Sequence, residues 1–284
     1  MSPSRRDLAL AWGLRGTAAL AGAVVVLIAG FLVVEALPAL RRVGWTRFAT
    51  DPSWHPVDGF YGLAPMLWGT LATALGAMLV AVPVGVLSAV FCRYYAPTSA
   101  ATLYRRLIEL LAGIPSVVYG FWGLVVLVPL IARLHPPGPS LLAGIVVLAV
   151  MIVPTIALLA DASLEAVPQA YLHGAAALGL SRWATVRRVA FPAAKSGLFT
   201  AVILGMGRAV GETMAVLMVC GNVVQIPASL FDPVRTLAAN IALEMAYAMG
   251  DHRSALFVGG LVLMAIILAL VLAAERLSRR SVYG

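Results

Sequence analysis

The stretch ASLEAVPQAYLHGAAALGLSRWATVRRVAFPAA, residues 162–194, is the only long polar interval in the middle of an otherwise apolar chain. It contains Arg182, Arg187 and Arg188, and Lys195 follows directly after it. Charged side chains at this density favour water over lipid. The segment must therefore be exposed to solvent, with membrane-buried regions on either side of it.

Local signals within this segment predict two short helices. Gly179 is expected to turn the chain, Ser181 to cap the second helix and Pro192 to stop it. The apolar positions that recur on one side at roughly helical spacing are Trp183, Val186 and Val189. A solvated helix with an apolar stripe is typical of a segment that docks on a partner, and a loop resting on lipid headgroups is the alternative.

The composition identifies the class of protein. Hydrophobic residues make up 62% of the 284 residues and charged residues 11%, which leaves too little polar surface to coat a soluble globule. A helix needs about 20 mainly apolar residues to cross a bilayer. We therefore expect an all-α integral membrane protein whose six transmembrane helices cover residues 17–37, 68–91, 107–134, 141–160, 198–220 and 255–274.

Positive charge gathers on one side of this topology. With the N-terminus inside, the basic residues of the cytoplasmic side are Arg5, Arg6, Arg15, Arg93, Arg105, Arg106, Arg182, Arg187, Arg188, Lys195, Arg276, Arg279 and Arg280. The outer side has fewer arginines, and acidic residues balance them, as the positive-inside rule requires. The net charge of +8 thus reflects topology and not a nucleic-acid partner. We expect cytoplasmic termini at residues 1–16 and 275–284 and a six-span domain at 17–274.

The first outer loop, residues 38–66, is rich in aromatic and turn residues. Amphipathic aromatic rings favour the boundary between lipid and water. Trp45, Trp54 and Tyr61 are therefore expected to be interfacial anchors, with docking of an external partner as the alternative.

The third predicted span contains GIPSVVYGFWG, residues 113–123. Pro115 removes a backbone donor, Gly113 permits close approach of a neighbouring helix, and Ser116 follows the proline directly. A helix break of this kind often lines a transport pathway, although kinked packing alone explains it equally well.

The fifth predicted span carries two charged residues, Arg208 and Glu212. They are four residues apart and would share one face of a continuous helix. Counting from Lys195, Arg208 is expected about 20 Å into the membrane. Because ionisable groups are costly there, both are candidates for a substrate pathway. The alternative is a mutually neutralising pair that locks helix packing.

The chemistry of this pair suggests its cargo. Arginine stays protonated and presents a planar fork to an oxyanion, so Arg208 favours an anionic substrate. Glu212 would repel a fully deprotonated anion such as sulfate, but it can accept a hydrogen bond from a P–OH group. We hypothesise that the pair favours hydrogen phosphate over sulfate.

The last outer loop is expected to hold one helix half-inserted from outside. Asp232 is predicted to cap it, Pro233 suits its first position, and Gly250 is predicted to end it. Apolar residues recur between them at helical spacing.

The sequence lacks the motifs of several enzyme classes. The only lysine is Lys195, preceded by Ala194, so no P-loop is present and ATP hydrolysis is not expected on this chain. The four histidines have no metal-ligand spacing, so neither a metal nor another cofactor is expected. A membrane enzyme is a distant alternative, testable by turnover without an ATPase.

The central segment resembles the cytoplasmic EAA loop of ABC-importer permeases, which reads Glu-Ala-Ala, three residues, Gly, nine residues and Ile-x-Leu-Pro. The matching positions here are His173, Gly174, Ala175, Gly179, Val189, Phe191 and Pro192. The spacing is kept, but histidine replaces the glutamate and Gly174 the first alanine. The resemblance implies a MetI-like permease fold in which this coupling loop, residues 162–194, docks on an ATP-binding subunit.

Three longer motifs are similar to the phosphate-specific (Pst) ABC importer permeases, of the PstC type. They are GIPSVVYGFWG, GRAVGETMAVLMVCGN and DPVRTLAANIALEMAYAMGDHRSALFVGGLVL, and the resemblance extends over about residues 61–263. It implies phosphate import across the cytoplasmic membrane and a role for Arg208 and Glu212 in phosphate passage. The implied partners are a PstA-like second permease, two PstB-like ATPases that use the ATP, and an extracytoplasmic PstS-like phosphate-binding protein.

Other readings stay open from the sequence. One is a permease for another oxyanion, sulfate or molybdate, against which the GRAVGET stretch argues. Another is the PstA-type partner itself. A third is a phosphate-sensing membrane scaffold with little flux, which measurement of uptake separates from a transporter.

Overall fold

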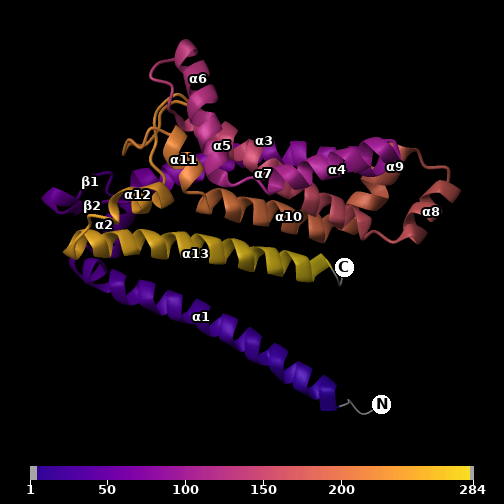
Figure 1. Cartoon of the computed structure of the whole chain (residues 1–284), viewed down its shortest axis with the longest axis horizontal. Coiled ribbons are helices and arrows are strands. Elements are labelled where there is room, and N and C mark those ends of the chain that lie inside the picture. The colour runs from indigo at the N-terminus through magenta and orange to yellow at the C-terminus, as the bar shows by residue number, and fades with distance from the viewer. Residues whose placement is uncertain (1–4, 282–284) are drawn as a thin grey trace.

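The computed structural model describes the backbone of residues 5–281 and, within that range, all side chains except those of residues 5–9, 274 and 277–281. Residues 1–4 and 282–284 of the two predicted terminal segments lie outside the described residues. Figure 1 shows the coupling-loop helices α8 and α9 at one end of the molecule and α2, α12 and the strands β1 and β2 at the other. Long helices connect the two ends.

The elements follow one another along the chain with short connections. In order they are α1 (Arg5–Val43), α2 (Trp45–Thr50), β1 (Trp54–His55), η1 (Pro56–Asp58), β2 (Phe60–Tyr61), α3 (Ala64–Tyr94), α4 (Thr98–Ala112), α5 (Ser116–Trp122), η2 (Gly123–Leu127), α6 (Val128–Leu134), α7 (Leu141–Glu165), α8 (Gln169–Ala177), α9 (Arg182–Thr185), η3 (Val186–Ala190), α10 (Phe191–Gly211), α11 (Met214–Val219), α12 (Leu237–Glu244) and α13 (Gly250–Ser281). The only strands in the described residues, β1 and β2, form a two-residue antiparallel ladder.

Six helical stretches of the described chain are long and apolar enough to cross a membrane, as the sequence predicts. They are Leu10–Val43, Ala64–Tyr94, Ser116–Leu134, Leu141–Glu165, Arg182–Gly211 and Gly250–Ala273. The third differs from the prediction because its helix begins at Ser116. Residues 107–112 instead belong to α4, an amphipathic helix that packs on α7 through the buried Ile108.

The fifth span also differs, because Pro192 does not stop the helix. A π turn, η3, precedes the proline, and the amide of Phe191 bonds to the carbonyl of Val186, five residues back. Proline lacks an amide hydrogen, and its ring collides with the carbonyl four residues earlier in a regular helix. The wider π turn re-registers the hydrogen bonds just before that point. The same arrangement occurs at η2, where the amide of Val128 bonds to Gly123 just before Pro129.

Helix α7 lies at the centre of the core. Val147, Leu148, Met151, Ile152 and Ile156 on this helix are almost fully buried. Glycines of the neighbouring helices face it: Gly76 and Gly85 on α3 and Gly205 on α10 contact Ile145 or Ile156, and Gly123 contacts Val147. Close approach of backbones through small residues is how helices pack where lipid removes the hydrophobic drive.

Helix α1 is attached differently. It contacts α13 and diverges from it toward the N-terminus (Figure 1). Its apolar side chains are mostly exposed, among them Leu20, Val26 and Leu27. An apolar surface of this kind suits lipid or a neighbouring subunit.

The helix predicted between the fifth and sixth spans exists as α12, but its predicted ends are wrong. Thr236 caps α12, because its hydroxyl accepts the amide of Ala239. The Asp232 carboxylate accepts the amides of Ala228 and Ser229 in the preceding turn. Gly250 begins α13 and does not end α12. A carboxylate that bonds backward within its own turn is unavailable as a cap for a later helix.

Candidate functional site

Arg208 lies in the last turn of α10 and is half-buried. Its Nη1 donates to the Oγ1 of Thr155 on α7 at 2.7 Å, and its charge acts on the hydroxyl of Tyr119 on α5. The guanidinium is thus held between α10 and α7 and remains partly accessible. Arginine has five N–H donors, so one bond to a hydroxyl leaves donors for a ligand.

Glu212 does not share a helix face with Arg208. Helix α10 ends at Gly211, and Glu212 has extended backbone with φ −68° and ψ 129°. Its Oε1 accepts the amide of Ala215 at 3.1 Å, at the start of α11. Among the described side chains, no ion pair joins Arg208 to Glu212. The packing-lock alternative is therefore wrong, and the two residues flank a break between α10 and α11.

A cavity of about 480 Å³ lies between α7 and α10 on the coupling-loop side of Arg208. Its α7 wall includes Leu159 and Ala166, which share a face with Thr155 at helical spacing, and its α10 wall includes Gly197 and Ala201, which share a face with Arg208. Hydroxyls also line it: the Oγ of Ser163 donates to the carbonyl of Leu159. The cavity thus lies on the same faces of α7 and α10 as Thr155 and Arg208, nearer to the coupling loop.

The predicted break at Gly113, Pro115 and Ser116 is present. Helix α4 ends at Ala112, Pro115 is extended, and α5 begins at Ser116. The hydroxyl of Tyr119 donates to the carbonyl of Leu111 at 2.8 Å across the break. Because Tyr119 is also the residue near Arg208, the structure brings this break close to the charged site.

The coupling loop folds as two short helices with the predicted turn. Gly179 has φ +70°, and the amide of Leu180 bonds to the carbonyl of Ala175, which closes α8 with a left-handed residue. The hydroxyl of Ser181 accepts the amide of Ala184 at the start of α9. The Gly179 and Ser181 predictions are confirmed.

The apolar stripe predicted on the second helix is split. Val186 is 0% exposed and packs with Val90 and Leu164 against the ends of α3 and α7, whereas Trp183 is 55% exposed. Trp183 and Val186 are three residues apart, so their side chains point about 60° apart around the helix, and only Val186 faces the bundle.

The motif positions of the loop divide by burial. Ala175 is buried and Phe191 and Val189 are half-buried, while His173, Gly174, Gly179 and Pro192 are exposed. The large apolar side chains that stay exposed are Tyr171, Leu178 and Trp183. The loop is thus anchored to the bundle through one side and presents apolar groups on the other.

A second charged cluster, which sequence reasoning missed, lies at the opposite end of the molecule. Glu244 on α12 is only 7% exposed. Its Oε1 accepts from Arg235 at 2.7 Å, and its Oε2 from Trp54 at 3.0 Å and from His252 at 2.8 Å. Arg235 also donates to the carbonyl of Asn222 and the side chain of Asn240.

This outer network corrects the prediction for two aromatic residues. Trp54 and Tyr61 are buried, and only Trp45 is well exposed. The indole N–H of Trp54 bonds to a carboxylate 190 positions away, a distance along the chain at which no local pattern signals the contact. The first outer loop is thus tied to α12 and α13 and is not an array of free interfacial anchors.

The chain is similar to known proteins over most of its length. Residues 81–283 match the model of the family described as binding-protein-dependent transport system inner membrane component. The chain is 41% identical over 266 residues to the "Probable ABC transporter permease protein YqgH" of Bacillus subtilis, covering 91% of this chain and 86% of that relative. It is 37% identical over 285 residues to the "Phosphate transport system permease protein PstC" of Mesorhizobium japonicum, with 92% and 86% covered.

Solved structures share the fold. A bacterial ABC transporter involved in the import of the acidic polysaccharide alginate matches with a TM-score of 0.66 and 13% identity, over 97% of this chain and 98% of that one. The MetNI methionine ABC transporter in an inward-facing conformation matches with a TM-score of 0.60 and 22% identity, over 81% and 99%. Fold, family model and sequence relatives agree, so the chain belongs to the family of binding-protein-dependent transport system inner membrane components, the permeases of ABC importers.

Proposed function

We propose that the chain is a PstC-type permease subunit of an ATP-driven importer that carries inorganic phosphate across the cytoplasmic membrane. The observation that carries this proposal is the similarity over more than nine-tenths of the chain to proteins named phosphate transport system permease protein PstC. They include the relative from Mesorhizobium japonicum and PstC 1 of Mycobacterium tuberculosis, at 37% and 38% identity.

The surroundings of Arg208 support an anionic cargo. A half-buried guanidinium whose one hydrogen bond within the described residues is to Thr155 has spare donors in a medium of low dielectric, where attraction to an oxyanion is strong. Glu212, held in extended backbone at the α10–α11 break, would accept a hydrogen bond from a protonated oxygen of the anion. Monohydrogen phosphate has such an oxygen and sulfate does not.

The path would run from the Arg208 region along the α7–α10 cavity toward the coupling loop. Partner subunits complete the machine: a PstA-like permease, two PstB-like ATPases and a PstS-like binding protein on the outer side. This chain would bind no cofactor, and ATP would be hydrolysed by the ATPases. The exposed Tyr171, Leu178 and Trp183 of the coupling loop supply an apolar surface for docking them.

Uptake of labelled phosphate by proteoliposomes containing the four kinds of subunit tests the proposal. We expect uptake that requires ATP hydrolysis and that persists in excess unlabelled sulfate. A non-hydrolysable ATP analogue is the control for leakage. Equal competition by sulfate and phosphate would contradict the selectivity, and absence of any phosphate uptake would contradict the cargo.

A further inference from the structure

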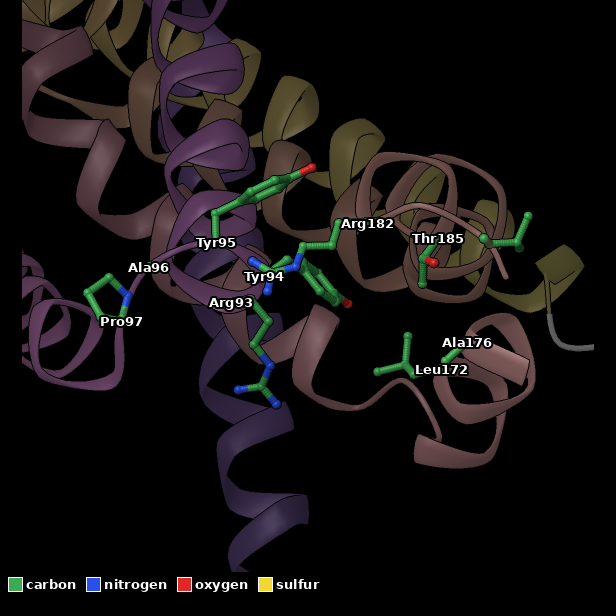
Figure 2. A pocket seen from close by; sticks show the side chains of 10 residues that line it. Arg93, Tyr94, Tyr95, Ala96, Pro97, Leu172, Ala176, Arg182 and Thr185 are labelled. Carbon is green, nitrogen blue, oxygen red and sulfur yellow. The ribbon is translucent and has the colours of Figure 1, made fainter. Parts of the chain in front are cut away.

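A separate cavity of about 600 Å³ opens at the coupling-loop end of the molecule. It lies between the end of α3 with the turn that follows it and the two coupling-loop helices, α8 and α9 (Figure 2). Leu172, Ala176 and Leu180 form an apolar wall. The remaining wall is polar, and nothing in the transport pathway described above uses it.

The polar wall carries positive charge and an unused hydroxyl. Arg93 and Arg182 line it from α3 and α9, and in Figure 2 the Arg182 side chain reaches toward Tyr94. The Tyr94 hydroxyl is buried and has no hydrogen-bond partner in the described part of the chain. Glu165 lies 3.5 Å from Arg93 and offsets only part of the charge. Buried hydroxyls are normally bonded, so an absent acceptor is indicated.

The position of the cavity relative to the bilayer indicates which kind of molecule supplies that acceptor. Helix α3 has 31 residues and is therefore about 46 Å long, against about 30 Å for the hydrocarbon core. With residues 68–91 across that core, as the sequence predicts, Tyr94 at the end of α3 and Tyr95 directly after it reach headgroup level. A stripe of half-exposed apolar residues leads along α3 to this point: Val80, Val84, Leu87, Phe91 and Tyr95.

We propose that this cavity binds the phosphate group of an anionic phospholipid, whose acyl chains lie along the α3 stripe. Arg182 and Arg93 contact the phosphate oxygens as charge-assisted donors, and the Tyr94 hydroxyl donates to one of them. The lipid then joins the end of α3 to the coupling-loop helices. Tyr95 lies both on the stripe and in the cavity wall, so one molecule can occupy both surfaces.

Native mass spectrometry of the full chain, with the subunits that co-purify with it, measures this binding. Nanodiscs of phosphatidylcholine alone are compared with nanodiscs that also contain phosphatidylglycerol, for wild type, Arg182→Gln and Arg93→Gln/Arg182→Gln. One basic side chain near an anionic surface contributes about fivefold in affinity, so we expect about fivefold weaker phosphatidylglycerol retention for the single variant and roughly 30-fold for the double. Tyr94→Phe, which removes only the hydroxyl, is expected to weaken retention by less.

Arg187→Gln/Arg188→Gln is the matched control, because both arginines are exposed on the same loop outside the cavity. The proposal requires that this control retain lipid as wild type does, and an equal loss would mean that only general attraction acts. A titration of inorganic phosphate in phosphatidylcholine nanodiscs separates the two sources of phosphate. Saturable binding there that Arg182→Gln abolishes, with no enrichment of phosphatidylglycerol in the wild type, would overturn the lipid assignment.

If the cavity binds a protein instead of a lipid, the variants are expected to change different measurements. If Arg182→Gln leaves phosphatidylglycerol retention unchanged and instead reduces recovery of the co-purifying subunits, the cavity holds an acidic side chain of a partner and the proposal is wrong. Thermal unfolding of each variant distinguishes these outcomes from misfolding, and Arg182→Lys is expected to restore part of the binding because it retains the charge.

Discussion

Two charged sites differ sharply in how their groups are held. At the outer end, Glu244 accepts three hydrogen bonds through both oxygens and Arg235 makes three bonds of its own. Between α10 and α7, Arg208 makes one hydrogen bond in the described part of the chain, to Thr155, and is half-buried. Both sites hold charged side chains within an apolar protein. Only in the outer network do hydrogen bonds from several residues occupy the charged groups.

This difference separates a structural role from a functional one. A buried charge that is fully bonded has no capacity for a ligand and serves to fix the elements that bond to it. A charge with spare donors, placed beside a cavity and a helix break, retains capacity for an anion. We therefore propose that the outer network serves stability and that the Arg208 region serves transport, and the two proposals are tested by different measurements.

Glu244→Ala is expected to have the largest effect, and the effect is on stability. It leaves Arg235 and His252 without their carboxylate, which should lower the free energy of unfolding by about 3–5 kcal/mol. Thermal unfolding in detergent measures it. Glu35→Ala is the matched control, because its pair with Arg253 is long at 3.9 Å and largely exposed, and a change below about 1 kcal/mol is expected. Equal effects of the two substitutions would refute the structural role.

Arg208→Ala is expected to reduce transport and to leave stability nearly unchanged, the reverse of Glu244→Ala. We expect phosphate uptake to fall at least about tenfold, equivalent to about 1.4 kcal/mol, while the midpoint of thermal unfolding changes little because no buried partner loses a charge. Uptake in proteoliposomes and unfolding of the same preparation are both measured. Arg208→Lys keeps the charge but loses the fork and is expected to be intermediate. Uptake that survives Arg208→Ala, with the complex assembled, would place the pathway elsewhere.

Thr155→Val makes a smaller change at the Arg208 site and can be compared with a similar change in the outer network. It removes the hydroxyl that accepts from Arg208 but preserves the side-chain shape, so the guanidinium is less well positioned. We expect a loss of about 0.5–1.5 kcal/mol in transition-state binding, or roughly two- to tenfold in uptake at low phosphate. Its counterpart is Asn240→Leu, which removes one partner of Arg235 and should affect unfolding and not uptake. A stability loss in Thr155→Val as large as in Asn240→Leu would contradict the distinction.

Much of the fold could be predicted because its signals are local. Apolar runs located the six spans, and a positive-φ glycine and a serine cap located the turn and second helix of the coupling loop. Pro192 was misleading because the π turn before it lets the helix continue. The end of α10 at Gly211 was missed because the spacing of Arg208 and Glu212 suits a helix, while the glycine between them signals its end only in hindsight.

The two charged sites also differ in whether the sequence alone could reveal them. Arg208 could be selected from the sequence because a charge within an apolar span is conspicuous by itself. The outer network could not, because Trp54, Arg235, Glu244 and His252 lie on separate segments and each looks like an ordinary loop residue. Only the folded chain brings them within hydrogen-bond distance, and long-range contacts of this kind have no periodic signature.

The continuity of the helix from Arg182 to Gly211 has a geometric consequence. Arg208 lies 26 residues after Arg182, or about 39 Å along the axis, and the helix continues through the π turn between them. A tilt of this rod by about 10° about its coupling-loop end would carry the guanidinium sideways by roughly 7 Å, more than two hydrogen-bond lengths. Small angular movements at the loop are thus geometrically amplified at Arg208, whose bond to Thr155 lies near the far end of the rod.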